Sequence, residues 1–175
     1  MMKFTETQKF SQPWILLLIG ISGLLPPIIF GFGIYQQIIL GKPFGNNPMS
    51  DNGLIITFIL TMALMIGLIA LFALAQLTTI IDKQGITYRF FPFQLSFRKI
   101  EWTQIDKYEI ITYNPIRDYG GWGLRYGKKG RALNVSGNKG LQLYLLNGKN
   151  ILIGTKKESE LTEFLLVIKP EKLHQ

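Results

Sequence analysis

The residues that could bind a ligand gather in one basic, glycine-rich stretch in the second half of the chain. Between Tyr119 and Lys139, glycines are interleaved with lysines, arginines and a single tryptophan. A cluster of cations favours binding of an anionic group, and tryptophan is typical of membrane interfaces and binding pockets. The candidate binding residues are Trp122, Arg125, Lys128, Lys129, Arg131 and Lys139.

A plainer interpretation exists for the same stretch. The cations would then cover a solvated hairpin tip, and Trp122 would be a core residue for which its small neighbours make room. Gly120, Gly121 and Gly123 fit a bulge or a tight bend. The cluster is therefore a hypothesis for a site that binds lipid or a partner protein.

No set of residues in the sequence amounts to a catalytic or metal site. The chain has no cysteine, and its one histidine, His174, is next to last. Asp118 is the best single candidate for a general acid or base, although a loop aspartate more often caps a turn. Gly127–Arg131 lacks the Ser/Thr and the spacing of a phosphate-binding P-loop. We therefore expect no catalysis, no cofactor and no bound metal.

Apolar and charged residues are segregated along the chain. Trp14–Leu40 and Leu54–Ala75 are almost wholly apolar, whereas 16 of the 19 lysines and arginines follow Ile81. This division predicts a membrane anchor over residues 1–76 and a basic domain over residues 77–175. An excess of positive charge indicates anionic lipid, nucleic acid or an acidic protein as the partner.

The anchor holds two candidate transmembrane helices, at about residues 14–34 and 54–75. A bilayer core of about 30 Å needs about 20 apolar helical residues, and neither span contains a charge. Pro26 and Pro27 are expected to kink or break the first span. A cleaved signal peptide is the competing interpretation, but the apolar run is too long and no A-x-A site follows it.

Lysine and arginine counts predict the orientation. The loop at 41–53 carries only Lys42, while cations flank both spans on the other side. The positive-inside rule then places both termini in the cytoplasm, with the chain in the cell membrane. Small residues recur at helical spacing in each span, so we expect the spans to pack on each other or on a second copy. Another membrane protein is a separate candidate partner.

The domain is predicted to contain seven or eight antiparallel strands and one C-terminal amphipathic helix. Its first strand follows the second span almost without a linker. Asn147-Gly148 between apolar-rich segments is a strong hairpin signal. Thr155–Glu158 fits a capping box, and Leu161 and Leu165 belong to an apolar helical stripe that Pro170 ends. The expected strands are Leu77–Ile81, Ile86–Phe91, Gln94–Ile100, Lys107–Tyr113, Trp122–Tyr126, Ala132–Ser136, Leu141–Leu146 and Lys149–Ile153.

This pattern resembles the pleckstrin-homology-like domains of bacterial membrane proteins, and in detail an uncharacterised group with two N-terminal spans. The matching segments are Leu77–Arg89, Gly120–Arg125, Val135–Gly140 and Ile151–Thr155. The resemblance implies an α+β fold, in which two transmembrane helices precede an antiparallel partial barrel closed by one helix. Phosphoinositide-binding relatives carry a basic residue where Thr87 stands, so inositol-lipid specificity is not expected.

These observations predict a membrane-anchored binding module at the cytoplasmic face of the membrane, for anionic lipid headgroups or a protein partner. A small oligomeric channel or transporter subunit is the alternative, and an enzyme using Asp118 is a weaker one. Tyr119, Trp122 and Tyr126 could stack on bases, but a domain tethered to a bilayer seldom meets nucleic acid, so no nucleic-acid partner is expected.

Overall fold

The computed structural model describes residues 2–10, 12–127 and 129–169. The chain forms two compact units, one made of Ser11–Ala73 and the other of Met1–Phe10 together with Leu74–Gln175. The predicted anchor, residues 1–76, therefore differs from the structure at its beginning. The first ten residues belong to the β-rich unit because they supply a strand to one of its sheets.

The helical unit consists of two long apolar helices. Helix α1 (Pro13–Ile34) continues through a π-helical turn, η1 (Tyr35–Ile39), and α2 is Asp51–Leu74. Both helices are long and apolar enough to cross a membrane. Helix α1 runs on through Pro26 and Pro27, so the predicted break does not occur. A helix in an apolar setting tolerates the loss of the hydrogen bonds that proline removes, because its other turns keep theirs.

Side chains fold the connection between the two helices into a defined turn. The Gln37 amide donates to the carbonyl of Met49 at 2.8 Å and to the Asp51 carboxylate at 2.7 Å. A Cβ on Gly33 would lie 2.8 Å from the ring of Phe44, so any larger residue there would force the ring to shift. Within this unit a Cβ on Gly23 would lie 3.4 Å from Ile69, which supports the predicted packing of the helices at that position.

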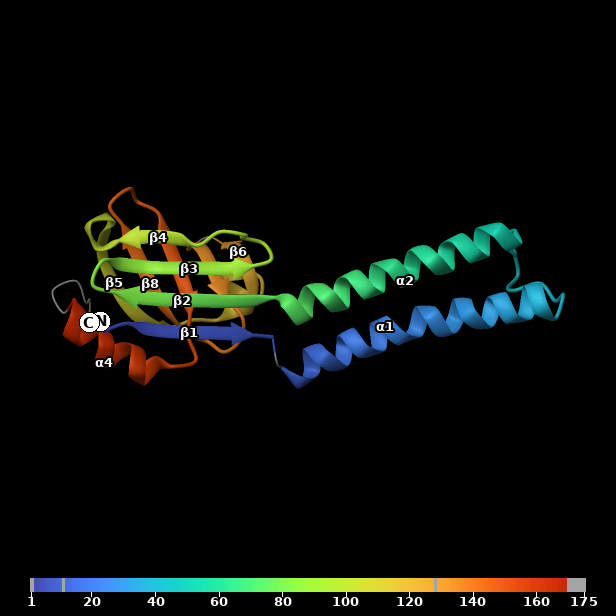
Figure 1. Cartoon of the computed structure of the whole chain (residues 1–175), viewed down its shortest axis with the longest axis horizontal. Helices are drawn as coiled ribbons and strands as arrows, with labels where there is room; N and C mark the ends of the chain where they lie inside the picture. The colour runs from blue at the N-terminus through green and yellow to red at the C-terminus, as the bar shows by residue number, and fades with distance from the viewer. Residues whose placement is uncertain (1, 11, 128, 170–175) are drawn as a thin grey trace. The chain divides into compact units, whose positions relative to one another are not determined.

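The β unit contains two sheets (Figure 1). The first has the order β1-β2-β3-β4 and is antiparallel, and the second has the order β5-β8-β9-β7-β6. In the second sheet β7 and β9 are parallel and the other pairs are antiparallel, so the fold is α+β with one mixed sheet. The strands are β1 (Phe4–Lys9), β2 (Gln76–Asp82), β3 (Gly85–Phe91), β4 (Arg98–Glu101), β5 (Ile105–Thr112), β6 (Gly123–Gly127), β7 (Gly130–Asn134), β8 (Lys139–Leu145) and β9 (Asn150–Gly154).

Strand β1 was not predicted from the sequence because its inward residues are mostly polar. Phe4, Glu6 and Gln8 are buried, and only Phe4 is apolar. The Glu6 carboxylate accepts hydrogen bonds from the Thr155 hydroxyl at 2.7 Å and from the Lys156 backbone N–H at 2.8 Å. Glu6 therefore fixes the segment that leads into the last helix.

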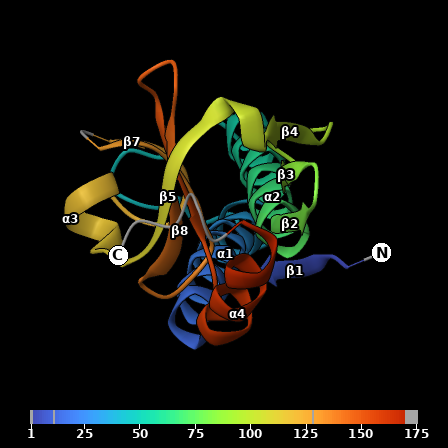
Figure 2. The same cartoon turned by 90° about the vertical axis from the view of Figure 1, so that its left-hand side faces the viewer.

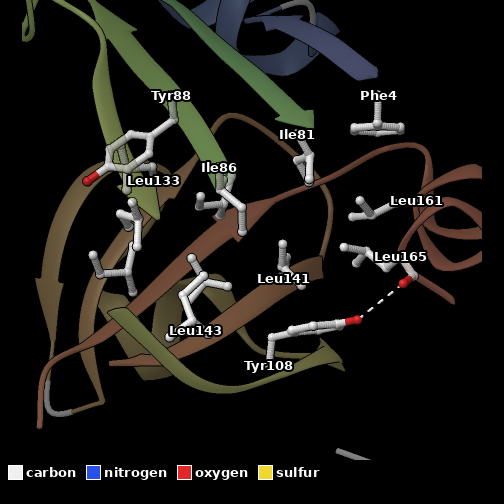
Figure 3. Packing of buried hydrophobic residues seen from close by; sticks show 14 of the residues in the cluster. Phe4, Ile81, Ile86, Tyr88, Tyr108, Leu133, Leu141, Leu143, Leu161 and Leu165 are labelled. Carbon is white, nitrogen blue, oxygen red and sulfur yellow. Dashed lines mark hydrogen bonds between the residues drawn. The ribbon is translucent and has the colours of Figure 1, made fainter. Parts of the chain in front are cut away.

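The apolar core lies between the two sheets and helix α4 (Glu158–Ile168), as Figure 3 shows. Leu161 and Leu165 of α4 point toward Ile81 and Leu141, which come from different sheets. The Tyr108 hydroxyl donates to the Leu165 carbonyl at 3.3 Å (dashed in Figure 3). Figure 2 shows α4 beside β1 and β8. The predicted C-terminal amphipathic helix is thus confirmed.

Two local predictions differ from the structure. The residue before α4 is Lys157, which makes no side-chain capping bond, so the predicted capping box is wrong. Thr155 instead uses its hydroxyl to bridge Glu6 and the Lys157 N–H. The expected strand at Gln94–Ile100 shortens to β4 because Gln94 turns inward in a loop. Pro170 lies outside the described residues.

Candidate functional site: a basic groove at two hairpin tips

The β6–β7 hairpin directs its cations to opposite faces. Leu124 of β6 is paired with Leu133 of β7, and both pack against the main core. Because side chains alternate along a strand, Tyr126 and its partner Arg131 lie on this same face. Arg125 is paired with the buried Ala132 and lies on the other face. The predicted single positive rim is therefore divided between two surfaces.

A cavity of about 610 Å³ opens on the Arg131 face. Three segments line it: the start of β4, the β6–β7 tip and the β8–β9 turn. Four cations border this basic groove, and none of its described lining residues is acidic. The lining residues are Arg98, Tyr126, Gly127, Lys129, Gly130, Arg131, Gly148, Lys149, Asn150 and Ile151.

Arg131 is the central cation of the groove. Its guanidinium lies 5.7 Å from the centroid of the Tyr126 ring, a cation–π distance that holds it in place. Its Nε is buried and has no hydrogen-bond partner among the described residues. A buried N–H without a partner is costly, so a movement of the Arg131 side chain that gives this N–H an acceptor on a ligand would be favourable.

Tyr88 of β3 lies beneath this cluster, next to Leu133 (Figure 3). Burial raises the pKa of its phenol, while the positive charges of Arg131 and Arg98 act in the opposite direction. The phenol therefore stays protonated at neutral pH and adds no negative charge to the groove.

Glycines allow the hairpin tip to pass close to its neighbours. Gly130 has φ +106°, and a Cβ there would lie 2.4 Å from the carbonyl oxygen of Asn150. A Cβ on Gly127 would lie 2.5 Å from the carbonyl oxygen of Asp118. The spacing of the two glycines thus brings the tip against β9 on one side and the Asp118 segment on the other.

Asp118 lies in a short helix, α3 (Pro115–Tyr119), and not in the loop that the sequence suggested. Its carboxylate accepts a hydrogen bond from the Asn114 N–H at 3.0 Å and lies 3.4 Å from the Lys129 ammonium. The Asn114 hydrogen bond, followed by the Lys129 charge, lowers the pKa of Asp118 against the opposing effect of desolvation. A general acid at neutral pH needs a raised pKa. Asp118 instead ties Lys129 to α3 beside the groove.

Helix α3 was missed because five residues are too few to show a helical period. The available signal was Asn114 followed by Pro115. The Asn114 side chain accepts from the N–H groups of Ile116 at 3.1 Å and Arg117 at 2.9 Å. Asparagine at the N-cap and proline at the first helical position are the usual start of a helix.

The remaining candidates lie away from the groove. The half-buried Trp122 donates from its indole N–H to the Gly137 carbonyl at 3.0 Å, and Arg125 donates to the Trp122 carbonyl at 3.0 Å. Lys139 forms an ion pair with Glu158 of α4 at 2.8 Å. The structure therefore brings together Lys129 and Arg131 of the predicted set and adds Arg98 and Lys149. Lys128 lies outside the described residues.

Comparison with known proteins gives one match. A family of unknown function, DUF6141, matches residues 2–169. The chain belongs to the DUF6141 family. No curated protein and no solved structure matches it. The family match covers β1, the two apolar helices and the sheets together.

The groove of this DUF6141 protein has the chemistry of an anion-binding site. Arginine presents a planar fork of donors that matches phosphate and carboxylate oxygens, and lysine adds a point charge. Among the residues that the structure describes, no group of three or more His, Cys, Asp or Glu side chains could hold a metal ion. None of the ion pairs in the described part of the chain involves Arg98, Arg131 or Lys149.

Proposed function

We propose that this protein is a membrane-anchored binding module whose basic groove takes the phosphate of an anionic lipid headgroup. The observation that carries the proposal is the convergence of Arg98, Lys129, Arg131 and Lys149 from three separate segments around one cavity without a described acidic residue. Positive charge on a single hairpin would be ordinary surface. Convergence from distant segments is typical of a binding site.

The membrane setting rests on the two apolar helices and on the strand register. Strands β1 and β2 pair in one sheet, with Lys9 opposite Gln76. The segments before α1 and after α2 therefore lie on the same side of any bilayer that the helices cross. Because the connecting loop carries only Lys42, the positive-inside rule favours the cytoplasmic side of the cell membrane for the β unit.

Two sheets around one core, closed by a C-terminal helix, support the pleckstrin-homology-like assignment that the sequence resemblance implies. Thr87 occupies a position that is basic in inositol-lipid binders of that type. The proposed ligand class is therefore a simple anionic phospholipid. An anionic inner leaflet would supply it at high local concentration.

The test is a calorimetric titration of the full chain, held in nanodiscs of phosphatidylcholine, with water-soluble dibutanoyl phosphatidylglycerol. Arg131→Ala should weaken binding by about tenfold or more, because hydrogen bonds to charged groups are worth about 1.5–3 kcal/mol. Arg125→Ala is the matched control, since it removes an arginine of the same hairpin from the opposite face. Affinity should also fall as salt is raised.

Equal affinity of the two variants would overturn the assignment of the groove. Inorganic phosphate, used as a second titrant, separates recognition of a headgroup from recognition of any phosphate. A poly-glutamate peptide that binds more tightly than the lipid would replace the lipid by an acidic protein partner.

A further inference from the structure

The loop between β3 and β4 turns three apolar side chains outward and the side chain of Gln94 inward. Phe93 is 56% exposed, Leu95 is 79% exposed and Phe97 is 45% exposed, whereas Gln94 between them is 6% exposed. A loop that faces water normally shows the reverse pattern, so this apolar tip needs a partner that is itself apolar.

Hydrogen bonds fix the loop in this arrangement. The Gln94 N–H donates to the Phe90 carbonyl at 2.8 Å, and the Gln94 side-chain oxygen accepts from the Phe90 N–H at 3.1 Å. The ring of Phe93 packs on that of Phe90, with 5.6 Å between centroids. The outward direction of Leu95 is therefore a feature of the folded loop and does not come from fraying.

Cations surround the apolar tip. The Arg89 guanidinium lies 4.3 Å from the centroid of the Phe97 ring and 5.8 Å from that of Phe91. Arg98 and Lys99 follow directly and are exposed. Aromatic and aliphatic side chains ringed by cations match the layers of a bilayer surface, where apolar groups enter the acyl boundary and cations meet the phosphates.

The chain itself holds this loop near the end of α2. Phe91, where the loop begins, is opposite Gln76 in the β2–β3 ladder, and α2 ends at Leu74. Two peptide units span at most about 7.6 Å, and neighbouring strands lie about 4.8 Å apart. The start of the loop is thus within about 12 Å of the end of α2 in any orientation of the β unit.

We propose that the loop Phe91–Phe97 inserts Phe93, Leu95 and Phe97 into the interfacial layer of the same membrane that α1 and α2 cross. This third attachment fixes which side of the β unit faces the lipid. The inference rests on the proposed membrane setting and is independent of what the basic groove binds.

The test uses single cysteines, because the natural chain has none. Leu95→Cys is labelled with the environment-sensitive fluorophore NBD in the full chain, reconstituted in phosphatidylcholine vesicles with or without brominated acyl chains. The matched control is Val167→Cys, also an exposed apolar residue (67%), which lies outside the groove. Phe164, one turn earlier in α4, packs on the ring of Phe4 with 6.1 Å between centroids, and Phe4 is opposite Ile81, so this part of α4 lies at the opposite end of the first sheet from Gln76.

The label at residue 95 should emit at shorter wavelength than the label at residue 167. Brominated lipid should quench the label at 95, and aqueous iodide should quench the label at 167. Quenching of both labels by iodide alone overturns the proposal. A label at 95 shielded from both quenchers also overturns it, because a protein surface or a second copy would then cover the loop.

Leu60→Cys, an exposed position of α2, tests the membrane setting separately from the insertion of the loop. If brominated lipid quenches the label at 60 but not that at 95, the loop proposal fails and the membrane setting stands. If brominated lipid quenches neither the label at 60 nor the label at 95, the membrane setting fails as well.

Discussion

Each face of the β6–β7 hairpin carries one arginine, but the surroundings of the two arginines differ. On one face Arg125 is bound to the Trp122 carbonyl, and the neighbouring Asn134 joins Gly123 to Tyr113 through 2.9 Å and 3.0 Å hydrogen bonds. On the other face Arg131 borders a cavity with three further cations, and its Nε has no partner among the described residues. The first face satisfies its polar groups internally, and the second leaves them for a ligand.

A local cluster of cations in the sequence therefore does not define a binding site. Arg125 and Arg131 are six residues apart, yet strand alternation sends them to opposite sides of a sheet. We call the face that carries Arg125 the outer face and the face that carries Arg131 the groove face. The outer face should govern stability, and the groove face should govern binding. The following substitutions test that division, beginning with the largest expected effect.

Gly130→Ala should damage both the fold of the hairpin and the groove. The added Cβ would lie 2.4 Å from the Asn150 carbonyl oxygen at a positive φ, so the tip must move away from β9. We expect a loss of about 3 kcal/mol in the free energy of unfolding and loss of lipid binding. Thermal unfolding followed by near-ultraviolet circular dichroism measures the first quantity.

Gly148→Ala is the control for this substitution. Gly148 also has a positive φ, +77°, but nothing lies within 4 Å of its added Cβ. It should cost about 1 kcal/mol through backbone strain alone. Equal losses for the two variants would show that contact between the tip and β9 contributes nothing.

Asn134→Ala should lower stability and leave lipid binding unchanged. The substitution removes partners from the Gly123 N–H and the Tyr113 hydroxyl, both on the outer face. Leaving buried polar groups without partners costs about 2 kcal/mol. A variant that keeps wild-type stability but loses affinity for dibutanoyl phosphatidylglycerol would reverse the roles assigned to the two faces.

Lys149→Ala should weaken lipid binding about threefold to tenfold, at little cost in stability. Lys149 is exposed and lines the groove, so its effect should shrink as salt is raised. Lys139→Ala is the control, because Lys139 is paired with Glu158. Equal weakening by the two variants would indicate a general attraction by net charge in place of a groove.

Alkaline pH should destabilise the β unit because the buried phenol of Tyr113, on the outer face, loses its proton. Burial raises the pKa of Tyr113 to about 12 in the folded chain, from an ordinary value of about 10. Unfolding then releases a proton in this window. The contribution to stability is complete below pH 10 and is lost as pH rises through about 12.

Tyr113→Phe should flatten that decline in stability and remove one of the late phenolate steps at 295 nm. Tyr144 supplies another such step, because its hydrogen bond to Glu109 raises its pKa to about 12 as well. An unchanged absorbance titration would contradict the buried position of Tyr113.

The sequence predicted those parts of the fold that depend on local patterns. The apolar runs identified both long helices, Asn147-Gly148 located the β8–β9 hairpin, and the spacing of Leu161 and Leu165 located α4. Strand β1 escaped prediction because its inward positions hold Glu6 and Gln8, whose partners are about 150 residues away.

The candidate site was predicted only in part for the same reason. Lys129 and Arg131 lie on one hairpin and stood out as a local cluster. Arg98 and Lys149 reach the groove from β4 and from the β8–β9 turn, and only the folding of the two sheets brings those segments together. No local signal marks either residue.

Strand β1 also decides which form of the protein should be studied. Residues 77–175 alone would lack β1, and with it the Phe4 side chain of the core and the Glu6 link to Thr155 and Lys156. The full chain is therefore the appropriate sample.

The most direct test of the division between the two faces is hydrogen exchange of the full chain in nanodiscs of phosphatidylcholine, with and without phosphatidylglycerol. Anionic lipid should slow exchange at Gly127, Gly130–Arg131 and Gly148–Ile151, and exchange should not change at Trp122–Arg125 or Gly137. Protection confined to Trp122–Arg125, or no protection at the groove in a folded chain, would contradict it.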